Sequence, residues 1–140
     1  MAITQALCSS FKKEILEALH DFNASGGNTF KMALYTSSAS LSATTTAYTT
    51  TGEVTGTGYT AGGNTLTNID PAVSGTTGFI DFSDTSWTSA TFTARGALIY
   101  NSTNSDKAVA VLDFGGDKTV SAGTFSIAFP TPSSSSAIIR

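Results

Sequence analysis

The stretch Gly96–Phe114, GALIYNSTNSDKAVAVLDF, decides the fold that the sequence predicts. Two apolar runs, residues 97–101 and 108–114, lie on either side of a polar segment rich in Asn, Ser and Asp. Short apolar runs are typical of β-strands, and Asn, Asp and Ser favour the turns that separate strands. We therefore expect two strands here, with a turn between them.

Runs of the same kind recur along most of the chain. In residues 29–36, Phe30, Met32 and Leu34 occupy alternate positions, which is the period of a strand with one buried face. Further strands are expected at residues 65–69, 78–82, 90–94 and 124–130, and a hairpin turn at Gly115–Asp117. Seven or so short strands with turns between them predict a mainly β protein, an antiparallel sandwich or barrel. Residues 37–63 have no clear period and are expected to form an extended connection or an irregular edge strand.

One helix is expected near the N-terminus, over residues 4–22, with Thr4 as its N-cap and Gly26 and Gly27 beyond its end. Apolar residues recur every three or four positions along it and form one stripe. The stripe consists of Leu7, Phe11, Ile15, Leu19 and Phe22. We expect Phe11, Ile15 and Leu19 to be buried, against the sheet or against another subunit.

The chain length of 140 residues is that of one ordinary domain. We expect a single domain over 1–140: the helix at 4–22, a β-sandwich at 29–130, and residues 131–140 as a C-terminal tail or last strand. Ile138 and Ile139 follow four serines near the end of the chain. Adjacent side chains of an extended segment point to opposite faces, so one isoleucine could dock on the domain and the other on a neighbour. Both are candidate interface residues, unless they form the last strand of the sandwich.

The composition points to an assembled protein rather than to one that binds nucleic acid. Only 12% of the residues are charged and Ser and Thr are abundant, so copies of the chain repel one another little. The net charge is −3 and the seven basic residues are scattered, which disfavours nucleic acid as a partner. No stretch has the length of a membrane-spanning helix, and no signal peptide is visible, so we expect synthesis in the cytoplasm. The single cysteine, Cys8, cannot form a disulfide within the chain.

Residues 56–61, GTGYTA, satisfy the G-x-G-x-x-G/A pattern of dinucleotide-binding turns. Such a turn needs a helix directly after it, because the pyrophosphate lies at the helix N-terminus. Here Gly62, Gly63 and β-branched residues follow, and Pro71 lies shortly beyond them. We therefore expect these glycines to serve turns and bulges, and we expect no cofactor.

The remaining candidates for chemistry are sparse. His20 is the only histidine, no G-x-S-x-G elbow accompanies it, and we expect a structural role for a partly exposed ring near the helix end. Asp81 and Asp84 could form an acid–base pair or hold calcium, although two nearby acids are more often caps and turn formers. Trp87 could be a platform for sugars or could be half-buried in the sandwich. We therefore expect no enzyme activity and no metal site.

Several long segments carry a specific resemblance that runs in order over nearly the whole chain. They are ITQALCSSFKKEIL, KMALYTSSASL, TTAYTTTGEVTGTGYTAGGNTLTN, RGALIYNST, KAVAVLDFGGDKTVSAGTF and FPTP…AIIR. The chain resembles a family of small virion proteins of tailed phages that includes capsid cement, or decoration, proteins. The resemblance implies a jelly-roll-like β fold on the outside of an HK97-type shell, with the major capsid protein and a second copy of the chain as partners. It brings no catalytic residue.

Two other classes of function stay open. One is a tail or receptor-binding component of the virion, in which Trp87 and polar loops would contact glycans. The other is a carbohydrate-binding module or a small hydrolase that uses Asp81 and Asp84. Many copies per virion would indicate a shell protein, and few would indicate a tail protein.

Overall fold

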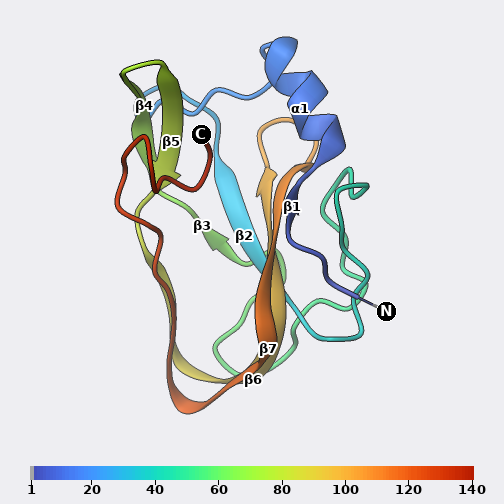
Figure 1. The fold of residues 1–140 in the computed structure, drawn as a ribbon. Helices are drawn as coiled ribbons and strands as arrows, with labels where there is room; N and C mark the ends of the chain where they lie inside the picture. Colours follow the sequence, from blue (N-terminus) through green and yellow to red (C-terminus); the bar gives the residue numbers. More distant parts are fainter. Residues whose placement is uncertain (1) are drawn as a thin grey trace.

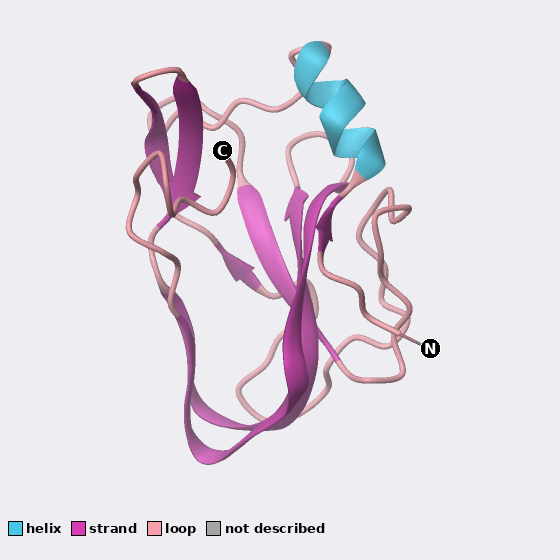
Figure 2. Ribbon diagram, in the orientation of Figure 1, coloured by secondary structure: helices cyan, strands magenta, loops and turns pink. Residues whose placement is uncertain are grey.

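The computed structural model describes residues 2–140 as a mainly β protein with antiparallel sheets and one helix (Figures 1 and 2). The elements in chain order are β1 (Ala6–Leu7), α1 (Ser9–Leu16), β2 (Phe30–Tyr35), β3 (Asn64–Thr65), β4 (Asn68–Ser74), β5 (Thr77–Phe82), β6 (Thr85–Asn101) and β7 (Lys107–Ile127). The prediction of an antiparallel, mainly β fold is confirmed.

One five-stranded sheet, in the order β1-β7-β6-β2-β3, forms the body of the molecule, and β4 and β5 form a separate hairpin. The long strands β6 and β7 pair along almost their whole length, from Asn101↔Lys107 to Thr85↔Ile127. Figure 1 shows this ribbon leaving the sheet, turning at the bottom of the view, and rising toward the β4–β5 hairpin. The outer part of the ribbon and the hairpin thus face the main sheet across the interior, an arrangement consistent with a β-sandwich.

Bulges let β6 and β7 bend without ending. The register shifts between Trp87 and Ala90, between Ala90 and Phe92, and again between Ala94 and Gly96. A bulge inserts an unpaired residue and increases the local bend and twist of a strand. The sequence therefore predicted too many strands: 90–94 and 97–101 belong to β6, and 108–114 and most of 124–130 belong to β7. The predicted hairpin turn at Gly115–Asp117 is wrong, because β7 continues through it.

The predicted pair of strands at 97–101 and 108–114 with a turn between them is confirmed, as the end of β6 and the start of β7. The predicted strands at 29–36 (β2) and 78–82 (β5) are confirmed as well. The run at 65–69 is divided instead between β3 and β4, which belong to different sheets. Residues 37–63 are irregular, as expected, and form isolated bridges to strands of the sheet, such as Tyr35↔Glu53 and Thr57↔Thr91.

The helix is much shorter than predicted. Thr4 is not its N-cap: its N–H donates to Leu41 O, and the next residues form β1 against β7, so the helix begins only after Cys8. At the other end, the N–H groups of Ala18 and Leu19 donate to the carbonyls of Ile15 and Glu14, and Ala18 has φ of +59°. These two bonds form a Schellman motif, which satisfies the last carbonyls of the helix and turns the chain away from its axis.

The interior is packed with aromatic rings. Below the helix, Phe22 stacks on Phe30 at 4.3 Å between ring centroids, and Phe82 lies 5.8 Å from Phe30. Within the bend of the ribbon, Phe125 lies 5.2 Å from Phe92 and 6.1 Å from Trp87. Offset and tilted pairs of this kind add to the stabilisation that burial already provides. The core therefore holds the outer ribbon against the main sheet.

Candidate interaction surface

Helix α1 provides one wall of an apolar cavity. The helix begins where the chain leaves the sheet after β1, and its Phe11 packs on His20 (4.9 Å) and Phe22 (6.0 Å). Burial of Phe11 fixes the orientation of the helix, so that Ile15, one turn later, faces the space above the sheet. Ile15 is not buried against the sheet, since it is 40% exposed, and Leu19 is only half-buried. Burial of these two side chains against another subunit, the second alternative, stays a prediction.

The hairpin β4–β5 and the C-terminal residues provide the opposite walls. Pro71 and Ala72 of β4 and Phe79 and Ile80 of β5 line the cavity. Ile139 bridges to β5: the N–H of Ile80 donates to Ile139 O at 2.9 Å, and the N–H of Ile139 donates to Ile80 O at 3.4 Å. The end of the chain is thereby held beside the hairpin and turns toward α1 (Figure 1).

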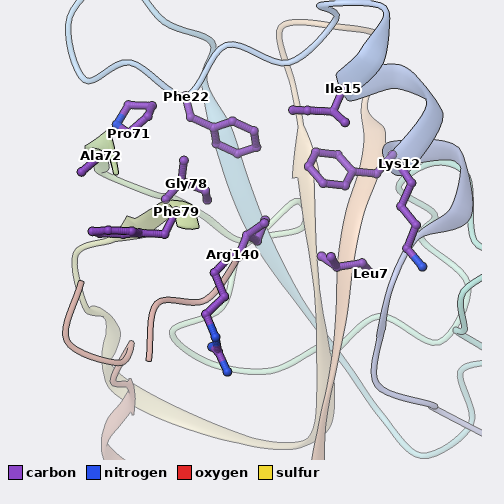
Figure 3. Close-up of a pocket in the computed structure, with 12 residues that line it drawn as sticks. Leu7, Lys12, Ile15, Phe22, Pro71, Ala72, Gly78, Phe79 and Arg140 are labelled. Carbon is purple, nitrogen blue, oxygen red and sulfur yellow. The ribbon is translucent and has the colours of Figure 1, made fainter. Parts of the chain in front are cut away.

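These walls enclose a groove of about 430 Å³, which we call the apolar groove (Figure 3). Its lining residues are Leu7, Phe11, Lys12, Ile15, Phe22, Pro71, Ala72, Gly78, Phe79, Ile80, Ile139 and Arg140. Ten of these twelve carry no charge, and the volume lies within the range of ordinary ligand pockets. Aromatic and aliphatic walls without buried polar groups suit an apolar side chain rather than a reacting substrate.

The large exposed apolar side chains of the described residues lie on two elements that line this groove, and Ile15 itself lines it. Among the described residues, the large hydrophobic side chains that stay exposed are Ile15, Leu16 (87%) and Val73 (72%). The first two belong to α1 and the third to β4, the elements that form opposite walls of the groove. Clustered exposed apolar groups mark sites of contact with another molecule. We therefore regard the groove and these three side chains as the candidate interaction surface.

The two isoleucines that the sequence singled out are placed partly at this surface. Ile138 and Ile139 are both half-buried and pack against the core, and Ala137 before them is buried. Ile139 lines the apolar groove, whereas Ile138 lines a shallower depression beside β1. The tail is thus neither detached from the domain nor a strand of the main sheet, because its isolated bridge joins it to β5 alone.

Trp87, the third candidate interface residue, lies in β6 inside the bend of the ribbon. It is only 3% exposed, and its indole packs between Phe125 and Tyr59 at centroid distances of 6.1 Å. Burial on this scale leaves no free ring face on which a sugar could stack. Trp87 therefore holds the ribbon against the sheet rather than contributing to an exposed surface.

Asp81 and Asp84 do not form a shared site. Asp81 is 1% exposed, and its Oδ1 accepts from the N–H of Phe82 at 2.9 Å. Burial raises the pKa of Asp81, with a smaller contribution from the charge of Asp84. Asp84 is exposed, and its Oδ1 accepts from the N–H of Phe129, just beyond the end of β7. Among residues 2–140, no group of three or more His, Cys, Asp or Glu side chains could hold a metal ion.

His20 lies in a buried polar cluster and not at the surface, so its predicted exposure is wrong. Its Nδ1 accepts from Asn101 Nδ2 at 3.0 Å, and its Nε2 lies 3.4 Å from Glu14 Oε1. The other carboxylate oxygen of Glu14 lies 3.0 Å from Lys107 Nζ. Burial lowers the pKa of His20 despite the nearby Glu14. These bonds tie the end of the helical segment to the β6–β7 turn, which is a structural role.

Cys8, the residue before α1, is also buried. Burial, with a contribution from the negative charge of Glu14, raises its pKa to about 11. The thiolate is the nucleophilic form of cysteine, and at neutral pH this residue is a thiol. Cys8 in this setting packs as a small apolar side chain.

The glycines of the 56–61 motif serve close contacts of the backbone. Gly58 has φ of +82°, and a Cβ at this position would lie 2.8 Å from the Cα of Ala90 in β6. No helix follows, because the chain continues through Gly62 and Gly63 into β3. These turns are fixed by Glu53, whose Oε1 accepts from Tyr59 Oη and from the N–H of Gly62, both at 2.7 Å. Glu53 thus fastens the irregular connection to the sheet.

Sequence reasoning found part of the candidate surface and missed the rest. It placed Phe11, Ile15 and Phe22 on one stripe and selected Ile139 as an anchor. It gave no role to Lys12 and Arg140, which line the groove, because single basic residues scattered along a chain carry no local signal. Within the described residues, no helix has the length and apolar character needed to span a membrane. No protein-family model, curated protein or solved structure was found to match this chain.

Proposed function

We propose that the chain is a structural virion protein of a tailed phage, a cement protein that binds the outside of an HK97-type capsid. In this proposal its fold is jelly-roll-like, its partners are the major capsid protein and further copies of itself, and it belongs to the capsid exterior. The observation that carries the proposal is the apolar surface made by the groove with Ile15, Leu16 and Val73. The resemblance of the sequence to phage virion proteins supports the same function.

The physical argument starts from the cost of leaving this surface in water. Burying apolar area contributes roughly 25 cal/mol per Å², so the exposed Leu16 and Val73 gain free energy when a partner covers them. A modest free energy at each contact is sufficient in a symmetric shell, because many identical contacts act together. A rigid β domain with few charges suits this task, since neighbouring copies repel one another little.

Copy number in the particle tests the proposal against the tail alternative. Virions of the phage that encodes the chain would be purified and their proteins quantified by gel and mass spectrometry. A cement protein should be present at a copy number comparable to that of the major capsid protein. Absence from the virion, or a copy number that is a small fraction of this value, would contradict the proposal.

The surface itself is tested by binding to shells from which the protein has been removed. The double variant Leu16→Ser with Val73→Ser should bind at least about tenfold more weakly, because two exposed apolar side chains no longer become buried. Both positions are exposed, so the melting temperature should not change. Ser126→Ala, at an exposed position on the outer part of β7, is the matched control and should bind normally. Equal binding of the double variant would place the contact elsewhere on the domain.

A further inference from the structure

We propose that the apolar groove binds a segment of a partner protein in which a large apolar side chain lies beside one or two carboxylates. This inference names the chemistry of the partner at the surface described above, and it rests on the proposed function only for the source of that segment. The argument comes from the lining of the groove, from the charges at its rim, and from the exposed side chains around it.

The floor of the groove selects an apolar group. Phe11 comes from α1, Phe22 from the connection that follows it, Phe79 and Ile80 from β5, and Leu7 from β1. A charged or amide group placed among these side chains would lose its bonds to water without gaining others. A bulky aliphatic or aromatic side chain would instead displace water from apolar walls.

The cations at the rim of the groove favour a negatively charged group beside the bound apolar side chain. Lys12 and Arg140 are the only charged residues in the lining, and Figure 3 shows both extending to the same side of the view, away from Ile15 and Phe22. Neither forms an ion pair with any described residue, whereas Lys13, Arg95 and Lys107 are each paired with an acid of the chain. A partner carboxylate beside either residue meets a cation that has no ion pair, and no acidic side chain lines the groove.

The side chains around the groove indicate a macromolecule rather than a small ligand. Leu16 follows Ile15 at the end of α1 and is 87% exposed, so the exposed apolar surface continues past the groove on the α1 side. A small molecule that filled the groove would leave Leu16 in water. A protein segment with its supporting surface can cover the groove and Leu16 together.

Charge also disfavours a second copy of the chain as the occupant. A two-fold contact brings the same patch of both copies together. The contact would then hold Lys12 and Arg140 of both copies, and no acidic side chain of the lining would neutralise them. Like charges brought together across an interface suppress a pairing. Complementarity thus favours an acidic and apolar segment of a different protein.

The test uses the full chain labelled with ¹⁵N and three blocked peptides, Asp-Phe-Leu-Asp, Asn-Phe-Leu-Asn and Lys-Phe-Leu-Lys. Saturable amide shifts are expected in α1, in the β4–β5 hairpin and in the last three residues. The Asp peptide should bind about fivefold more tightly than the Asn peptide, because two exposed ion pairs form, and the Lys peptide should bind most weakly. Lack of saturable shifts, shifts at another surface, or binding of the Lys peptide as tight as that of the Asp peptide would overturn the inference.

Variants separate the role of the rim from general electrostatics. Lys12→Gln with Arg140→Gln should make the Asp and Asn peptides bind equally while the melting temperature stays unchanged. Lys13→Gln removes the neighbouring helical charge, which is paired with Glu17 and does not line the groove, and it should preserve the preference. If the double variant keeps the full preference for the Asp peptide, the rim does not select the partner.

The remaining outcomes distinguish this inference from the proposed function. If dilution of the free chain shifts the same groove amides and sedimentation shows a dimer, a second copy occupies the groove and the inference is wrong. Shells that are decorated normally by a chain whose groove binds no peptide would leave the function standing and overturn the inference. If the peptides bind in the expected order but the chain is absent from virions, the inference stands and the proposed function is wrong.

Discussion

His20 illustrates how the environment of one residue sets its chemistry. As the only histidine of the chain, it was the natural candidate for acid–base catalysis, yet both of its ring nitrogens have partners inside the protein. Asn101 donates to Nδ1, and the amide is held in that orientation because its Oδ1 accepts from the N–H groups of Thr103 and Asn104. A proton on Nδ1 would therefore point at another donor. The neutral ring is the form that this cluster stabilises.

His20 should make the free energy of unfolding depend on pH. Burial lowers the folded-state pKa of His20 below its ordinary 6.5, so below that pH the unfolded chain binds the proton more readily. The free energy of unfolding should then fall as the pH is lowered from about 7.5 to about 5, by at most about 1.4 kcal/mol per pH unit for one proton. Urea unfolding of the wild type and of His20→Gln at each pH measures this decrease in the free energy of unfolding. The variant should have the flatter profile, and parallel profiles would contradict the assignment.

At the scale of elements, local periodicity found the strands but could not tell where elements end. The stripe Leu7–Phe22 has helical spacing, yet Leu7 pairs with Ala110 and the helix ends at Leu16. The start of the helix depends on the pairing with β7, and its end depends on the left-handed conformation of Ala18. Tertiary structure decides both features. In the same way, Gly115 and Gly116 resemble a hairpin turn in sequence but lie within a continuous bent strand. A bulge and a turn use the same residue types, so only the pairing distinguishes them.

The two faces of α1 provide a test at this scale. Phe11 is 3% exposed and packs on two aromatic rings, so Phe11→Ala should lower the free energy of unfolding by about 3–5 kcal/mol. Ile15 is partly exposed and lines the groove, so Ile15→Ala should cost less than about 1.5 kcal/mol. Chemical denaturation of both variants measures the difference. Equal losses would mean that Ile15 is buried in the core as the sequence suggested.

For the whole molecule, the candidate surface is assembled from three parts of the chain that are far apart in sequence. Leu7 to Ile15, Pro71 to Ile80, and the last two residues meet only because the outer ribbon carries the C-terminus back to the hairpin. No local pattern encodes that meeting, which is why the sequence predicted an anchor at Ile139 but not the groove that it lines. The low content of charged residues, by contrast, was visible from the composition alone, and the candidate surface likewise carries little charge.

The low content of charged residues leads to a prediction about the proposed contact with a capsid. In that contact Leu16, Val73 and the groove walls would become buried, while only Lys12 and Arg140 contribute charge. Exposed ion pairs are worth roughly 0–1 kcal/mol each and are screened by salt, whereas apolar burial is not. Decorated shells washed in about 1 M NaCl, where the Debye length is about 3 Å, should therefore keep most of the protein, as measured by sedimentation and gel. Leu16→Ser should instead be released at every salt concentration. Release of the wild type between about 0.1 and 0.5 M NaCl would show that charge dominates the contact, because only a charge-dominated interface loses its affinity over that range.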